Sequence, residues 1–242
     1  MPQFLLDPKN VQGDFVILPP EEAKHLIKVL RYKHGDTLWV SDGQNRWRAV
    51  IEEATPKSAR LKLLEKCSLP QTAPAPALGV ALLKHDHLEW VLQKGVELGC
   101  REFFLFDSAR TVPRFWETVT AKKLARFEKI LAEAAKQSGL IGHPKIHPPL
   151  SFPELTRQFP KFSAVLLAWE EETQSDFAAA FQTLDPSNLL ILIGPEGGFS
   201  RDEVVLAEKA GAKKISLGAQ ILRSETAAIA LLTLCQYELG NI

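Results

Sequence analysis

The sequence predicts an α/β protein with two domains, of which the second and larger contains a mostly parallel sheet. Three observations lead to this prediction. Residues 1–66 contain short β-prone runs, separated by turn residues, and one helical stretch. A proline-rich segment then interrupts the pattern. Beyond it, continuous apolar runs alternate with helical stretches, which is typical of buried parallel strands covered by helices on both faces.

The first domain is expected to be a small β-barrel. Its β-prone runs lie at 15–18, 37–40, 46–51 and 59–64. The tripeptide Ser41-Asp42-Gly43 gives a hairpin signal between two of them. One helix is predicted to begin at Pro20, with an apolar stripe formed by Ala23, Leu26, Ile27 and Leu30. Several short strands with a single helix favour a barrel.

The domain boundary is predicted in the segment 69–77. This segment contains Pro70, Pro74 and Pro76. Neither a helix interior nor a central strand tolerates this density of proline, so an extended linker is expected. We therefore expect domains at residues 1–70 and 77–242.

In the second domain, strands and helices are expected to alternate. The strands are predicted at 78–83, 103–106, 164–168, 189–193 and 215–217. The helices are predicted at 86–99, 120–138, 200–211 and 224–239. Asp86 with Glu89, and Ser200 with Glu203, have the spacing of capping boxes at two of the helix starts.

The composition indicates a globular protein without a dominant charge. The chain has 242 residues, 45% of them hydrophobic, and its 29 basic side chains balance 29 acidic ones. Any affinity for nucleic acid must therefore come from local patches. The first residues lack a signal-peptide pattern and no apolar run is long enough to cross a bilayer, so we expect a cytoplasmic protein without membrane contact.

The sequence predicts no metal site. Cys67, Cys100 and Cys235 are widely spaced, without a CxxC pair, and are expected to be reduced. His143 and His147 lie four residues apart, but Pro144 between them excludes the helix that would bring them to one face.

Two glycine-containing turns are the strongest candidate for a binding site. One turn is Gly194-Pro195-Glu196-Gly197-Gly198, and the other runs from Leu217-Gly218 to Thr226. Each follows a predicted strand and precedes a predicted helix, which is where ligands bind in parallel sheets. No GxGxxG, P-loop or GxSxG pattern is present at these places. The alternative is that Gly194 and Gly218 only form tight turns.

At these residues the chain resembles the knotted SPOUT methyltransferases, and more narrowly the bacterial 16S rRNA (uracil-1498-N3)-methyltransferases. The resemblance extends in order over nearly the whole chain. Its most specific parts are the two glycine blocks, the second continuing through Ile221-Leu222-Arg223-Ser224-Glu225-Thr226, and Val29-Leu30-Arg31. Weaker matches include Gln93-Lys94 with Glu97-Leu98-Gly99, and Ser108-Ala109-Arg110.

The resemblance implies a PUA-like β-barrel followed by an α/β trefoil-knot domain that forms a homodimer. It implies S-adenosyl-L-methionine as the cofactor and N3 of a uridine in 16S rRNA of the small ribosomal subunit as the target. The cofactor-binding residues that it implies are Leu167, Ala168, Trp169, Ile193, Gly194, Pro195, Glu196, Gly197, Gly198, Leu217, Gly218, Ile221, Leu222 and Thr226.

Three residues are candidates for a catalytic role. Arg223 and Glu225 flank the second glycine turn and can orient a base or bind phosphate; alternatively they form a salt bridge at the helix start. Arg110 follows a strand at its carboxyl end, and its alternative is a solvated loop arginine. The base that accepts the N3 proton is not identified from the sequence.

The candidate RNA-binding residues are mostly basic, and they are Lys28, Arg31, Lys33, Lys84, Arg110 and Gln137. Two segments depart from the family. Lys84-His85-Asp86-His87 stands where the pattern Lys/Arg-Gly-x-Lys/Arg is usual, and Leu140 stands where an arginine is usual. Two other functions stay open: methylation of another RNA, such as tRNA ribose, and a non-catalytic role in ribosome assembly.

Overall fold

The structure is a computed structural model that describes residues 3–6, 8–42, 45–67, 74–84, 86–111, 119–140 and 142–242. The chain divides into two compact units. The first contains Met1–Gln71 and Ala135–His143, and the second contains Thr72–Ala134 and Pro144–Ile242. Most of the expected linker, together with Gly43 and His85, lies outside the described residues.

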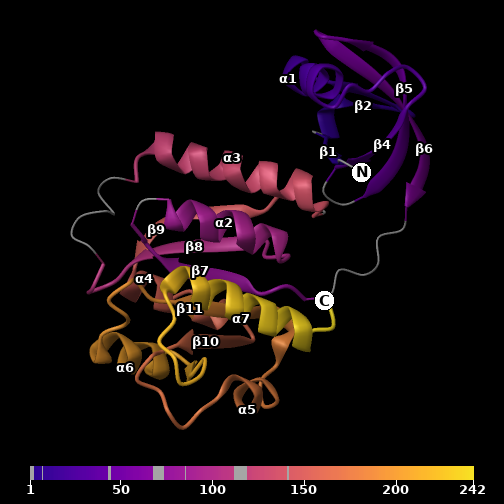
Figure 1. Cartoon of the computed structure of the whole chain (residues 1–242). Coiled ribbons are helices and arrows are strands. Elements are labelled where there is room, and N and C mark those ends of the chain that lie inside the picture. The colour runs from indigo at the N-terminus through magenta and orange to yellow at the C-terminus, as the bar shows by residue number, and fades with distance from the viewer. Residues whose placement is uncertain are drawn as a thin grey trace. The chain divides into compact units, whose positions relative to one another are not determined.

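The first unit contains a six-stranded sheet with the order β1-β4-β5-β6-β3-β2 (Figure 1). Its strands are β1 (Gln3–Leu5), β2 (Val11–Gln12), β3 (Phe15–Leu18), β4 (Thr37–Ser41), β5 (Arg46–Thr55) and β6 (Ser58–Cys67). All pairs are antiparallel except β1 with β4. The long pair β5–β6 has two register shifts, which bend and twist a ribbon of this length.

One helical segment covers the core of the first unit. It consists of α1 (Pro20–Lys24) and a π-helical turn, η2 (His25–Val29); a short 3-10 turn, η1 (Pro8–Asn10), precedes it. Ala23 and Leu26 are fully buried against the sheet, as the apolar stripe predicted. Alternate residues of β3 and β4, such as Val16 and Val40, complete this core.

The second unit contains a six-stranded sheet in which every pair is parallel, with the order β12-β10-β11-β7-β8-β9. The strands are β7 (Ala77–Ala81), β8 (Glu102–Asp107), β9 (Lys145–Ser151), β10 (Ala164–Ala168), β11 (Leu189–Ile193) and β12 (Ala212–Ile215). Every residue of the central strands β7 and β11 is buried. Both faces of the sheet are therefore covered, which explains the continuous apolar runs.

Helices pack on both faces of this sheet (Figure 1). They are α2 (His87–Glu97), α3 (Ala121–Ser138), α4 (Phe152–Thr156), α5 (Phe177–Phe181), α6 (Arg201–Lys209) and α7 (Ser224–Glu238), with 3-10 turns η4 (Phe159–Lys161) and η5 (Pro186–Asn188). On one face α2 packs against α7, and a Cβ at Gly95 would lie 2.8 Å from the ring of Phe103. On the other face, Phe106 packs against Phe152 and Phe199.

The structure differs from the sequence predictions at β9 and β12. Strand β9 contains Pro148 and Pro149, which made it unrecognisable as a strand. Because β9 lies at the sheet edge and pairs only with β8, it tolerates residues without an N–H donor. The last strand ends at Ile215 rather than at Leu217. It begins earlier, at Ala212, where exposed lysines hid an edge strand.

The two predicted capping boxes have different outcomes. At α6, the backbone N–H of Glu203 donates to Ser200 Oγ and the N–H of Ser200 donates to Glu203 Oε2 at 2.9 Å. At α2, the described contacts include no cap hydrogen bond to the Asp86 side chain. Glu89 instead accepts a 2.7 Å bond from Arg126 of α3. A contact between helices has replaced the local cap.

The cysteines behave as small apolar residues. Cys100 and Cys235 are free and buried, and burial raises the pKa of both thiols to about 12. In the part of the chain that the structure describes, no helix has the length and apolar character needed to cross a membrane.

Candidate functional site

A cavity of about 620 Å³ lies in the second unit, beyond the carboxyl ends of β10, β11 and β12. The two glycine-containing loops and the start of α7 form most of its wall. The lining residues are Lys84, His87, Ala168, Trp169, Glu170, residues 193–199, residues 216–225 and Ala227. This volume lies within the range of small-molecule sites, and its place at the strand ends is typical of ligand sites in parallel sheets.

The first loop, residues 194–199, depends on the absence of side chains. A Cβ at Gly198 would overlap the carboxylate of Glu170, and its backbone has φ +69°. A Cβ at Gly194 would lie 3.1 Å from the ring of Phe199, which anchors the end of the loop in the core. The loop is therefore held close to its neighbours, with its backbone facing the cavity.

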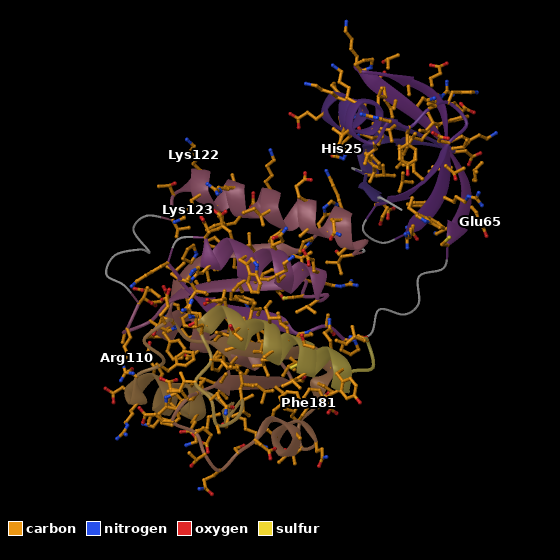
Figure 2. All side chains as sticks on the ribbon, viewed as in Figure 1. His25, Glu65, Arg110, Lys122, Lys123 and Phe181 are labelled. Carbon is orange, nitrogen blue, oxygen red and sulfur yellow. The ribbon has the colours of Figure 1, made fainter. Side chains whose placement is uncertain are left out.

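Two other loops hold this first loop from outside. Arg110, labelled in Figure 2 beyond the end of β8, donates from Nη1 to the carbonyl of Gly197 at 3.0 Å. The backbone N–H of Lys84 donates to Glu196 Oε1 at 3.0 Å. Arg110 does not line the cavity. The hydrogen bond of Arg110 to Gly197 indicates that this side chain positions the loop.

The second loop, residues 216–223, supplies an apolar wall. Gly218 has φ +113°, and its N–H donates to Ser216 Oγ at 3.3 Å. Ile221 lines the cavity with 84% of its surface exposed, and Leu222 follows it. An apolar side chain this exposed inside a concave site is available to cover the flat face of a ligand.

The start of α7 contributes polar groups to the cavity. Arg223 is the N-cap residue and is exposed; the described contacts include no cap bond from its side chain. Glu225 is largely buried, with 16% of its side chain exposed, and its Oε2 lies 3.8 Å from Nδ1 of His87. Glu225 thus pairs with α2, whereas the sequence suggested a salt bridge with Arg223.

Trp169 forms the third part of the wall, at the end of β10. Its backbone N–H donates to Ile215 at 3.0 Å, and Lys214 Nζ lies 5.7 Å from its ring centre. Its indole Nε1 is buried, and no partner for it exists among the described residues.

Glu172 fixes the loop that follows Trp169. Its Oε1 accepts hydrogen bonds from the N–H groups of Gln174, at 2.6 Å, and Ser175. The Gln174 bond chiefly lowers the pKa of this carboxyl, with smaller contributions from Ser175 and Lys214. Because Lys214 contacts both Glu172 and the Trp169 ring, this charged group also supports the cavity wall.

Most of the predicted cofactor residues line this cavity. The exceptions are Leu167, which is buried in the core below it, and Thr226, which is exposed outside it. Lys84, predicted to contact RNA, lines the cavity as well. The sequence reasoning did not propose His87, Glu170, Phe199, Ser216 or Ala227 as site residues, and the structure adds them to the lining.

Four other predicted RNA-binding residues are not among the residues that line this cavity. Lys28, Arg31 and Lys33 are exposed in the first unit, and Gln137 is exposed at the end of α3. Arg31 has φ +58°, a left-handed conformation that is strained for a side chain of this size.

No metal centre is visible in the described ranges. They contain no group of three or more His, Cys, Asp and Glu side chains that could hold an ion. His147 instead contacts Glu102 at 2.8 Å and stacks on Phe104.

Comparison with known proteins identifies both parts of the chain. Residues 71–236 match a family described as an RNA methyltransferase domain, and residues 18–64 match an RNA methyltransferase PUA domain. These matches confirm the predicted combination of a PUA-like domain with a SPOUT-type α/β domain.

Relatives of the same name are similar over their whole length. Ribosomal RNA small subunit methyltransferase E of Mesomycoplasma hyopneumoniae is 35% identical over 97% of this chain and 99% of its own. The protein of that name from Bacillus subtilis is 31% identical over 90% of this chain and 88% of its own. A crystal structure of the Neisseria gonorrhoeae protein of that name, bound to S-adenosyl methionine, superposes with a TM-score of 0.85, at 26% identity over 98% of both chains. The chain therefore belongs to the family of ribosomal RNA small subunit methyltransferase E.

Proposed function

We propose that this protein transfers a methyl group from S-adenosyl-L-methionine to N3 of a uridine, of the uracil-1498 type, in 16S rRNA. The observation that carries the proposal is the cavity formed by two glycine loops in a chain of this family. The relatives' names favour small-subunit ribosomal RNA over the tRNA alternative. In this proposal the protein acts in the cytoplasm.

The lining fits the proposed cofactor. Backbone N–H and C=O groups of the glycine loops can bind the edge of an adenine ring, and Ile221 and Leu222 can cover its faces. The buried Nε1 of Trp169 is a donor that lacks a partner among the described residues, which suits a site completed by a polar ligand.

The protein's task in this reaction is chiefly positioning. The cofactor supplies a methyl group on a positively charged sulfur. The loops must hold it in line with the target nitrogen, which then needs little covalent help. The uracil must leave any base pair before its N3 can be reached. Arg223, which is exposed and lines the cavity, is proposed to orient the uracil.

The Gly197→Val variant tests the cofactor site. A Cβ at Gly197 would lie 3.1 Å from Cβ of Arg110, so the branched side chain must displace the loop. We expect calorimetry to show cofactor affinity reduced by about 10- to 100-fold, since overpacking costs roughly 1–3 kcal/mol. Gly197→Ala should have a smaller effect, and Ala178→Val, on an exposed face of α5, should have none. Unchanged affinity in Gly197→Val would remove this loop from the site.

Arg31 is proposed to contact RNA phosphate from the first unit. Arg31→Gly should stabilise the protein by about 1 kcal/mol, because glycine accepts the positive φ, yet it should weaken binding to small subunits. Arg31→Ala should weaken binding to small subunits without raising the free energy of unfolding. Denaturant unfolding and filter binding at several salt concentrations measure these effects; intact RNA affinity in both Arg31 variants would contradict the assignment.

Arg223→Ala should instead lower the methylation rate with little change in RNA affinity.

A homodimer through the second unit is also proposed. Its support is the last helix, α7, where Leu234 and Tyr237 are exposed although the opposite side of the helix is buried. Sedimentation at low micromolar concentration should show a dimer, and Leu234→Glu with Tyr237→Glu should give monomers. A wild-type monomer with full activity would rule the dimer out.

The substrate is proposed to be an assembled small subunit rather than free RNA. The chain has no net charge and carries Leu140 where the family usually has arginine, so long-range attraction to RNA is weak. Methyl incorporation into small subunits should exceed incorporation into protein-free 16S rRNA by about tenfold or more at matched salt. Mapping of the product should place the methyl group on N3 of one uridine. Equal rates on both substrates would show that ribosomal proteins are not needed for recognition.

A further inference from the structure

His87 and Glu225 form a pair within the cavity that the proposed mechanism has not used. His87 is the first residue of α2, and Glu225 lies in the first turn of α7. Nδ1 of His87 is 3.8 Å from Oε2 of Glu225, and both residues line the cavity. The imidazole is 45% exposed whereas the carboxylate is 16% exposed. The carboxylate therefore lies behind an imidazole that is open to a ligand.

The proposed reaction requires such a group. N3 of uracil carries a proton, which must leave before or as the nitrogen takes a methyl group. The other ionisable side chains of the lining are Lys84, Glu170, Glu196 and Arg223. Lys84 and Arg223 are cations without a free lone pair. Glu196 accepts from the Lys84 N–H, and Glu170 packs against Gly198.

We propose that His87 is the base that accepts the N3 proton of the target uracil, with Glu225 stabilising the imidazolium that forms. This inference rests on the proposed function. Imidazole is the side chain best suited to take a proton near neutral pH, and a neighbouring carboxylate favours its charged form. With Nδ1 directed at Glu225, the opposite nitrogen, Nε2, remains to receive the proton.

The step balances as follows. The N3–H bond of uracil breaks, and its proton forms a bond to the lone pair of His87 Nε2. The electron pair left on N3 forms the new N–C bond to the methyl carbon. The C–S bond of the cofactor breaks and leaves its pair on sulfur, which becomes neutral. The imidazolium later returns its proton to water.

Charged groups of both signs surround His87. The acidic ones are Glu225 on α7, Asp86 at the N-cap of α2, and Glu170 and Glu196 in the cavity lining. The basic ones are Lys84 and Arg223, which also line the cavity. Among the residues that the structure describes, Glu225 is the only one with a charged group within ion-pair distance of the His87 ring.

The test is single-turnover methyl transfer to small subunits that lack the modification, measured across about pH 5.5 to 9. For wild type we expect the rate to rise with pH over the range in which imidazole loses its proton, and then to level off. His87→Gln should transfer about 100-fold more slowly near neutrality, and its rate should keep rising with pH as solvent becomes the base. Glu225→Gln should also slow the transfer, though less than His87→Gln, because the imidazolium loses its partner.

Two further variants separate a base from a binding group. His87→Lys places a polar, positively charged side chain at this position but offers no lone pair near neutrality, so it should be as slow as His87→Gln. His143→Gln, an exposed histidine outside the cavity, should leave the rate and its pH profile unchanged. Calorimetry with the cofactor and filter binding of small subunits should give dissociation constants within about twofold of wild type for every His87 variant.

Each outcome has a distinct meaning. Full activity of His87→Lys would overturn the proposal, as would a wild-type pH profile in His87→Gln. A loss of transfer rate that is explained entirely by weaker binding of the cofactor or the small subunit would also overturn it. If wild type itself gives no N3-methyluridine, the proposed function fails instead. The wild-type product analysis therefore distinguishes the two failures.

Discussion

The site depends on one constraint: three segments approach one another too closely for a Cβ atom. The loop after β11 lies against Glu170 at Gly198 and against Arg110 at Gly197, and it turns back on Phe199 at Gly194. Larger residues there would separate the loops that follow β8, β10 and β11. Because these loops meet only where parallel strands end together, the sheet order is what makes the glycines necessary. Fold and site are thus two consequences of the same close packing.

Much of this could be predicted from the sequence, because the relevant signals are local. Continuous apolar runs located β7, β8, β10 and β11, and the glycine blocks located most of the cavity wall. What could not be predicted depends on contacts distant in sequence. The capping signal of Asp86 and Glu89 was local, yet Arg126 took the Glu89 carboxylate. His87 was noticed in the sequence only as a departure from the family pattern, and its contact with Glu225, on another helix, could not be predicted from the sequence.

In the proposed function, the two units contribute to recognition in different physical ways. The second unit holds a concave site, in which geometry would select the ligand. The first unit has Lys28, Arg31 and Lys33 exposed on its surface, where charge would position a polyanion without reading its sequence. Arg31 has a left-handed backbone and an exposed side chain, and strained backbone of this kind often occurs at functional sites.

The hydrogen bond between the Lys84 N–H and Glu196 joins residues 112 positions apart, and it closes one side of the cavity. The central strand pair β7–β11 spans a similar interval. During synthesis, β7 therefore emerges long before the strand that covers it, and its apolar surface must wait for the last third of the chain. Sheets with such distant pairings fold slowly, because the entropy of loop closure is lost before the contacts form. Because the lining extends to Ala227, the cavity is complete only after nearly all of the second unit has been made.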